Sequence, residues 1–182
     1  MKDFIKDLII AIIIVVAISM VIKPTIVKER SMQPTLYENN YLFVNKLTYK
    51  FKDHPNRGDI IVFKSQLDDE QNGGKKLLIK RVIGVEGDIL TIEDGYVYRN
   101  GEKIDEPYIK EQGSTYDEDY EVSGFTVPED QVFCMGDNRE ASLDSRSTDV
   151  GTIAEKSIVG KAFFRLYPFN KIGSITQYSE KE

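Results

Sequence analysis

The residues best suited to covalent chemistry are a serine and a lysine, because the common catalytic bases are almost absent. The 182-residue chain contains one histidine, His54, and one cysteine, Cys134. A Ser-His-Asp triad would have to use His54, and a papain-like site would need His54 together with Cys134. Zinc sites usually require several His or Cys ligands. The composition therefore argues against a zinc enzyme, and a lysine becomes the base to examine.

Lys80 lies in an apolar run that has the composition of a strand. Residues 77–84 are apolar apart from Lys80 and its neighbour Arg81. Adjacent side chains of a strand point to opposite faces, so one of these two should face apolar neighbours. If this is Lys80, on the same face as Leu78 and Val82, burial lowers its pKa and the neutral amine can accept a serine proton. The alternative for Lys80 taken alone is an edge-strand lysine in water.

Two further segments carry polar groups in a pattern that can form a site. Ser31 precedes a turn stiffened by Pro34, and taken by itself it is better explained as a turn residue. Residues 136–146 follow the apolar run 132–135 and contain acidic, arginine and hydroxyl side chains that can pair with one another. A structural turn network is the alternative for this second segment.

An apolar segment near the N-terminus predicts a membrane anchor. Residues 8–22 contain no charge, and a helix of this length spans ~22 Å at ~1.5 Å per residue, short of the ~30 Å hydrocarbon core. Apolar residues on both sides extend it, so we expect a short tail at 1–7 and an anchor at 8–26. A cleaved secretory signal and a buried core helix are the alternatives. Lysines on both sides leave the orientation open.

The remainder of the chain predicts a mainly β body with antiparallel sheets. Short aliphatic and aromatic runs alternate with turn signals rich in Gly, Asn and Asp. We expect one β domain over residues 27–174 and a polar tail over 175–182, with solvated loops at 68–76 and 111–124. The expected strands are residues 41–44, 59–63, 77–83, 88–92, 96–99, 125–127, 131–135 and 158–166.

The bulk composition limits the partners. Hydrophobic and charged contents of 41% and 30% are ordinary for a globular body. The net charge of −6, without a basic stretch interleaved with aromatic residues, argues against nucleic acid as the main partner.

Taken together, these segments resemble the type I signal peptidases, in their compact Gram-positive form. Residues 31–35 are similar to the nucleophile box of that family, and residues 57–63 to its next strand. Residues 80–84 match the lysine box, and residues 136–146 match the last box. Order, spacing and the apolar N-terminal segment agree, and the resemblance covers about residues 1–170.

The resemblance implies a role for each matching residue. Ser31 would attack the scissile carbonyl and form an acyl-enzyme, with Lys80 as general base and no cofactor. Ser142 would orient the lysine amine, and Asp144 and Arg146 would form a supporting ion pair.

The resemblance also implies a substrate and a location. The substrate would be the end of a signal peptide of an exported preprotein, with small residues at the first and third positions before the cut. The enzyme would be a single-pass protein of the cell membrane, in contact with the lipid bilayer, with a cytoplasmic N-terminus and an external catalytic body. The expected pocket walls are Val27, Met32, Leu36 and Ile79.

Glu29 is a departure from the pattern. The Ser31 backbone N–H would serve the oxyanion hole, and some family members add a serine hydroxyl two residues before the nucleophile. Glu29 occupies that position here, and an ionised carboxylate cannot donate a hydrogen bond.

Two other functions are compatible with parts of the sequence. A self-cleaving repressor peptidase shares the Ser-Lys dyad and a β architecture, but the apolar segment 8–22 counts against it. A membrane-anchored β module that binds partners without catalysis is the second, and the presence of both Ser31 and Lys80 counts against that.

Overall fold

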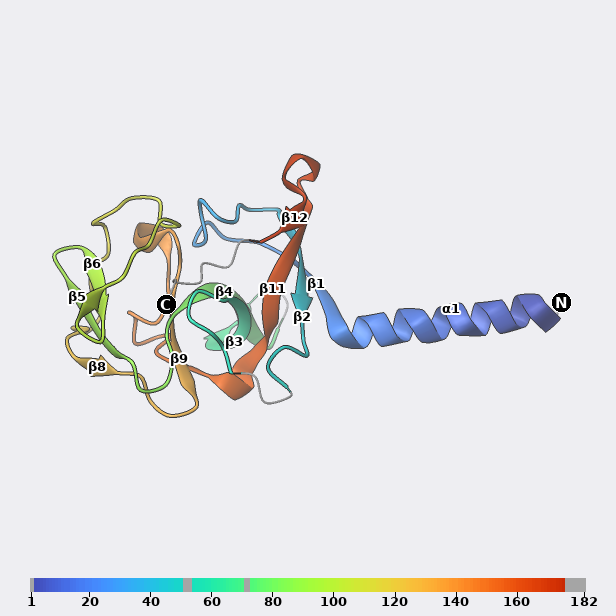
Figure 1. The fold of residues 1–182 in the computed structure, drawn as a ribbon, viewed down its shortest axis with the longest axis horizontal. Helices are drawn as coiled ribbons and strands as arrows, with labels where there is room; N and C mark the ends of the chain where they lie inside the picture. The colour runs from blue at the N-terminus through green and yellow to red at the C-terminus, as the bar shows by residue number, and fades with distance from the viewer. Residues whose placement is uncertain (1, 51–53, 71–72, 176–182) are drawn as a thin grey trace.

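The protein consists of one helix and a β body, and helix α1 (Lys2–Val21) projects away from the body (Figure 1). The computed structural model describes residues 2–50, 54–70 and 73–175. The stretch Asp3–Val21 is long and apolar enough to cross a membrane, and none of its spanning window is buried. A buried core helix, one of the alternatives from the sequence, is therefore wrong.

The helix ends earlier than the expected anchor boundary at residue 26. It stops at Val21, and β1 (Ile22–Ile26) follows directly. Pro24 has no N–H to donate and disfavours helical geometry at Lys23, so the helix cannot continue through this pair. β1 instead pairs with β2 (Tyr41–Asn45) in the body.

The body contains two antiparallel sheets, as the sequence predicted. The larger has the strand order β1-β2-β11-β3-β4-β9-β10, with β12 also paired to β11. The smaller has the order β7-β6-β5-β8 and lies at the end of the body away from α1 (Figure 1). The remaining strands are β3 (Ile60–Asp68), β4 (Lys75–Gly84), β5 (Ile89–Glu93), β6 (Tyr96–Arg99), β7 (Glu102–Lys103), β8 (Phe125–Thr126), β9 (Gln131–Met135), β10 (Ile153–Ala154), β11 (Ile158–Tyr167) and β12 (Gly173–Ser174).

Three short 3₁₀ turns complete the elements: Arg139–Ala141, Glu155–Ser157 and Phe169–Lys171. Each of the eight expected strands matches an observed one to within a few residues, apart from β3, which is longer. The strands that the sequence reading missed are β1, concealed by the expected anchor, and the two-residue strands β7, β10 and β12. The expected loop 68–76 is shorter at both ends, because β3 reaches Asp68 and β4 begins at Lys75.

Strand β4 lies at the centre of the molecule and has apolar clusters on both sides. Leu78 and Val82 belong to a cluster with residues of β3 and β9, whereas Ile83 packs with residues of the smaller sheet. As a result, the last five residues of β4, from Lys80 to Gly84, are all buried. The sequence reading expected one of Lys80 and Arg81 to be buried, and the structure buries both.

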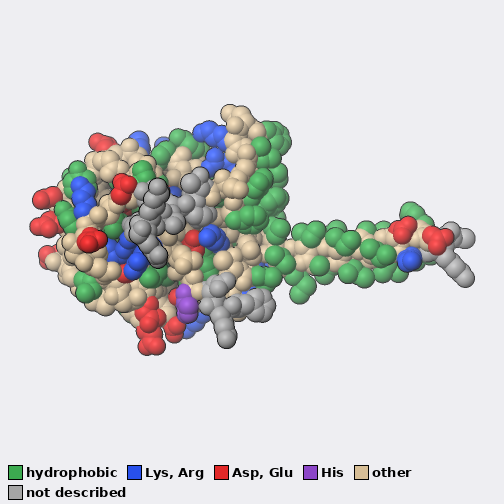
Figure 2. All heavy atoms as spheres, viewed as in Figure 1, with side chains coloured by type: hydrophobic (Ala, Val, Ile, Leu, Met, Phe, Trp, Pro, Cys, Tyr) green, Lys and Arg blue, Asp and Glu red, His purple; other side chains and the backbone are tan. Residues whose placement is uncertain are grey.

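The outer face of the larger sheet carries aromatic side chains where water-facing polar residues are usual. Tyr41 meets Tyr167 across the β2–β11 pair, and Tyr167 meets Phe169, which is 73% exposed. Phe43 stacks on Phe164 in the same strand pair. Figure 2 shows apolar side chains gathered on the side of the body from which α1 departs. We call the five residues Tyr41, Phe43, Phe164, Tyr167 and Phe169 the aromatic face.

The expected C-terminal tail at 175–182 begins with a residue that belongs to the body. Ile175 is buried, and its N–H donates a hydrogen bond to the carbonyl of Phe163. The rest of that tail lies outside the described residues.

Candidate active site

Ser31 lies in the turn that follows β1, and the loop that follows β9 contacts it. It follows β1 by five residues and is 5% exposed. Met32 is buried in the adjacent core cluster, and its carbonyl accepts a hydrogen bond from the N–H of Leu36. The carbonyl of Ser31 accepts a hydrogen bond from the Asn138 N–H at 3.0 Å. Packing on one side and this backbone bond on the other therefore fix the serine.

Lys80 is brought to Ser31 by strand β4. It is cross-strand neighbour to Ile61 and is 1% exposed. A hydrogen bond of 2.8 Å joins Lys80 Nζ to Ser31 Oγ, across 49 positions of sequence. This is hydrogen-bond distance for a nucleophile and its base.

The surroundings of Lys80 favour a neutral amine. Burial lowers the pKa of Lys80 below its ordinary value, because the charged form loses hydration. Asp144 and Glu29 oppose this, since their negative charges raise the Lys80 pKa, but burial is the larger effect. A neutral amine beside a serine hydroxyl can accept its proton, which is what a general base must do.

His54 and Cys134 do not form a rival site. The side chain of His54 is 70% exposed and contacts Glu155. Cys134 is fully buried, and burial raises the pKa of its thiol, which keeps it protonated. No cluster of three or more His, Cys, Asp or Glu with metal-binding geometry occurs within residues 2–50, 54–70 and 73–175.

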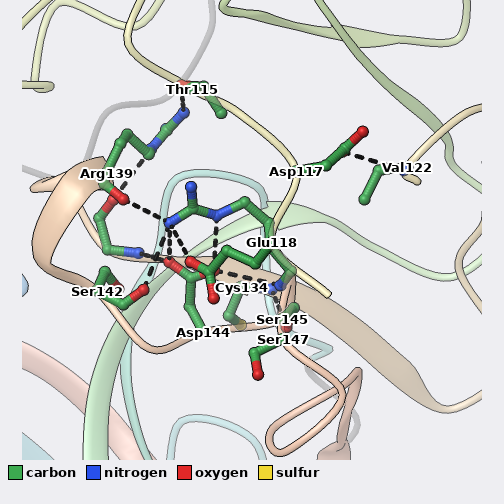
Figure 3. Close-up of polar contacts among 12 residues, drawn as sticks. Thr115, Asp117, Glu118, Val122, Cys134, Arg139, Ser142, Asp144, Ser145 and Ser147 are labelled. Atoms are coloured by element: carbon green, nitrogen blue, oxygen red, sulfur yellow. Dashed lines mark hydrogen bonds and ion pairs between the residues drawn. The ribbon is translucent and has the colours of Figure 1, made fainter. Parts of the chain in front are cut away.

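The loop after β9 contains the ion pair expected from the resemblance (Figure 3). Arg146 Nε donates to Asp144 Oδ1, and Arg146 Nη2 donates to Asp144 Oδ2, both at 2.9 Å. Asp144 Oδ2 also accepts a hydrogen bond from the N–H of Gly136 at 3.0 Å. The carboxylate thereby connects the end of β9 to the loop beside Ser31.

Ser142 lies in this loop but does not make the expected hydrogen bond to Lys80. Its hydroxyl is buried and has no hydrogen-bond partner in the described part of the chain. A side chain added at Gly136 would clash with Ser142 Oγ and with the Ser31 carbonyl. The Ser142 hydroxyl thus lies close to the Ser31 backbone, while Lys80 Nζ is hydrogen-bonded to Ser31 Oγ.

A cleft of about 970 Å³ opens beside the dyad. Two parts of the chain supply most of its walls: residues 23–29 with Ser31 and Met32, and residues 68–70 with 76–79. Tyr41 and Val62 also line it. Of the expected pocket residues, Val27, Met32 and Ile79 line the cleft. Leu36 does not line the cleft, and its side chain is fully buried in the core cluster that contains Met32.

The sequence reading missed charged groups around the dyad. The sequence reading treated Glu29 only as a departure from the family pattern. In the structure, Glu29 forms an ion pair of 2.6 Å with Lys76, a residue that no motif had indicated. Glu118 forms a second carboxylate contact to Arg146 at 3.1 Å, and burial raises the Glu118 pKa. Both contacts join segments that are remote in sequence, and single-segment patterns carry no signal for such pairs.

Comparison with known proteins identifies the family of this chain. The family model described as signal peptidase, peptidase S26, matches residues 1–167. The signal peptidase I of Bacillus amyloliquefaciens is 36% identical over 178 residues, covering 93% of this chain and 90% of that protein. A probable signal peptidase I-2 of Synechocystis sp. is 34% identical, covering 97% of this chain and 78% of that protein.

A solved structure is also similar. A signal peptidase I from Enterococcus faecalis V583 is 33% identical, with a TM-score of 0.47, and the match covers 60% of this chain and 97% of that chain. The family match over most of the chain, with two relatives above 30% identity, identifies the fold and the enzyme class. The chain therefore belongs to the signal peptidase family, peptidase S26, whose members are serine endopeptidases.

Proposed function

We propose that this chain is a membrane-bound endopeptidase that removes signal peptides from exported preproteins, with Ser31 as nucleophile and Lys80 as general base. The observation that carries the proposal is the buried hydrogen bond of 2.8 Å between Ser31 Oγ and Lys80 Nζ. The names of the relatives, all signal peptidases I, support the substrate class.

Acylation begins when neutral Lys80 takes the hydroxyl proton of Ser31 and Ser31 Oγ attacks the scissile carbonyl carbon. The carbonyl electrons move onto the oxygen, and the Ser31 N–H stabilises the oxyanion. The C–N bond then breaks, and Lys80 gives its proton to the leaving amine of the mature protein. The signal peptide remains attached to Ser31 as an ester.

Deacylation uses the same base a second time. Lys80 is neutral again after it has protonated the amine, so it can take a proton from water as the water oxygen attacks the ester. Collapse of the tetrahedral intermediate returns a proton to Ser31 Oγ and releases the signal peptide as a carboxylic acid. Because each proton passes through Lys80, the low pKa of this buried amine supports both steps.

The substrate would be selected by the size of its side chains before the cut. Val27, Met32 and Ile79 are apolar and line the cleft next to Ser31. Val27 and Met32 are almost fully buried, so only a small apolar part of each side chain faces the cleft, and pockets formed there would be shallow. This setting favours small residues at the first and third positions before the scissile bond.

Helix α1 and the aromatic face support a location at the membrane. We place the N-terminus in the cytoplasm, α1 across the membrane and the body on the external side. Aromatic side chains are favoured at the boundary between lipid and water. Strands β2 and β11, which carry most of the aromatic face, lie on the side of the body from which α1 departs (Figure 1). This position supports contact of the body with the bilayer surface.

The central experiment is incubation of the purified full chain with a preprotein that ends its signal peptide in Ala-x-Ala, followed by N-terminal sequencing of the product. We expect one cut after the second alanine. Ser31→Ala and Lys80→Ala should each abolish it. Exposed Ser123→Ala and Lys110→Ala are matched controls that should cleave normally. Full cleavage by both dyad variants would refute the assignment.

The membrane contact has its own test, because the chain contains no tryptophan. Phe169→Trp places one fluorophore on the aromatic face, and Tyr98→Trp places one on the distant strand β6. In vesicles that contain brominated lipids, we expect quenching at position 169 and none at position 98. Equal signals at the two positions would contradict the proposed contact.

A further inference from the structure

Two side-chain pairs connect the same two segments of the chain. The first is the dyad, Ser31 with Lys80, at 2.8 Å. The second is the ion pair between Glu29 Oε1 and Lys76 Nζ, at 2.6 Å. Each pair takes one member from the turn after β1 and one from strand β4. The ion pair therefore lies two residues before the dyad in the turn and four residues before it in β4.

The two pairs differ in their contact with water. Ser31 and Lys80 are 5% and 1% exposed. The side chains of Glu29 and Lys76 are 44% and 39% exposed. Residues at even spacing on a strand share a face, so Lys76 and Lys80 lie on the same face of β4. The ion pair is thus the solvent-side neighbour of the buried dyad.

Both members of the ion pair line the cleft, and they belong to its two different walls. The pair consequently joins the walls at their exposed side. A peptide that reaches Ser31 through this cleft must lie beside the ion pair or separate it. Exposed ion pairs contribute little net stability, because water solvates both partners well. A bound peptide can therefore replace the contact.

We propose that Glu29 and Lys76 form a charged subsite that determines which substrate side chains are accepted at one position near the scissile bond. The proposal rests on the peptidase function proposed above. When the peptide separates the pair, an acidic substrate side chain can contact Lys76 and a basic one can contact Glu29. With both residues present, the two preferences balance. This gives Glu29 a role at a position where it cannot donate to an oxyanion.

The test is a charge scan of the substrate. In a soluble signal-peptide substrate, each position flanking the cut is replaced in turn by Asp, Asn or Lys, and kcat/KM is measured for the full chain. We expect Glu29→Gln to favour Asp over Lys at one position by about two- to fivefold, the range of exposed ion pairs. Lys76→Gln should favour Lys over Asp at that same position.

A charge swap and a neighbouring lysine supply the controls. Glu29→Lys combined with Lys76→Glu keeps both charges and should restore the balanced preference. Lys75→Gln removes the adjacent lysine, which pairs with Asp68 instead, and should leave the charge preference unchanged. Thermal melts of all variants should coincide, since the substituted side chains are exposed.

The outcomes separate this subsite from the dyad. If the wild type cleaves but no position responds with opposite signs to Glu29→Gln and Lys76→Gln, the subsite is refuted while the peptidase function stands. If the wild type fails to cleave any preprotein or peptide, the peptidase function is refuted, and the subsite with it.

Discussion

Lys80 and Arg81 are adjacent, equally buried at 1% exposure, and surrounded very differently. On one side of β4, Lys80 Nζ meets only the Ser31 hydroxyl among the hydrogen bonds that the structure describes for it. On the other side, Arg81 donates two hydrogen bonds to Asp137, at 2.8 and 2.7 Å, and one to the Gly58 carbonyl. The Tyr108 ring lies 4.0 Å from its guanidinium carbon.

The same arrangement recurs in the other buried arginines of this region. Arg139 is paired with Glu106, and Arg146 with Asp144. A buried cation with a carboxylate partner stays charged and connects two segments, whereas a buried amine facing a hydroxyl is driven towards its neutral form. The difference teaches that counter-ion placement, rather than burial, separates the structural cations from the one proposed to be catalytic.

Replacement of Lys80 should give the largest functional effect with the smallest structural one. Lys80→Met fills the same space without an amine, so we expect kcat/KM to fall by about 10⁴-fold, as for other dyads and triads. The free energy of unfolding should stay equal or rise, because no carboxylate loses a close partner. A preprotein cleavage assay and urea denaturation measure the two quantities. A strongly destabilised variant would break the comparison.

Replacement of Arg81 should have a large effect on stability and a smaller one on activity. Arg81→Met leaves Asp137 buried without its partner, which costs about 3–5 kcal/mol of unfolding free energy. Urea denaturation measures this loss. Combining Arg81→Met with Asp137→Leu removes both charges and should recover most of it. If the double variant is as unstable as the single one, the ion pair is not the source of the effect.

Two buried serines of the loop after β9 extend the comparison to hydroxyls. Ser145 Oγ accepts a hydrogen bond from the Cys134 N–H at 2.9 Å, whereas Ser142 Oγ has no partner among the described residues. Ser145→Ala should therefore lower the unfolding free energy by about 1–2 kcal/mol, and Ser142→Ala should not. If Ser142 orients the Lys80 amine during the reaction, Ser142→Ala should instead lower kcat by about tenfold, the value of one hydrogen bond.

The smallest expected effects concern pH. Cleavage should rise as pH increases through the Lys80 pKa, because the neutral amine is the active form. Glu29 raises the Lys80 pKa and Lys76 lowers it. Glu29→Gln should therefore move this rise to lower pH, and Lys76→Gln should move it to higher pH, in the kcat/KM profile. Shifts in the same direction would contradict the assignment of Lys80 as base.

The pH dependence of the unfolding free energy should also reflect Lys80. The Lys80 pKa is lower in the folded chain than in the unfolded one, so the unfolded chain binds more protons between these two pKa values. The unfolding free energy should consequently rise with pH across that window. Lys80→Met should lack this contribution, and equal pH slopes for the two proteins would argue against a depressed Lys80 pKa.

The sequence by itself determined the features that depend on neighbours along the chain. Short aliphatic and aromatic runs between turn signals placed β6 and β9 at their observed bounds, and the uncharged apolar run at residues 8–22 placed a helix near the N-terminus. The scarcity of His and Cys, combined with four motifs in family order, selected Ser31 and Lys80 as candidates. The inferences about strands and helix succeeded because periodicity and turn chemistry are local properties, and the assignment of Ser31 and Lys80 stays a prediction.

Only the tertiary structure decided the features that depend on contacts between remote segments. Residues 22–26, which hydrophobicity alone assigned to the anchor, pair as strand β1 with β2 in the body. Core packing removed Leu36 from the cleft, and it buried Lys80 and Arg81 together on opposite faces of β4. Which of these two cations meets a carboxylate, and which meets a hydroxyl, depends on β4 lying between the Ser31 turn and the Asp137 loop, and strand periodicity carries no information about that placement.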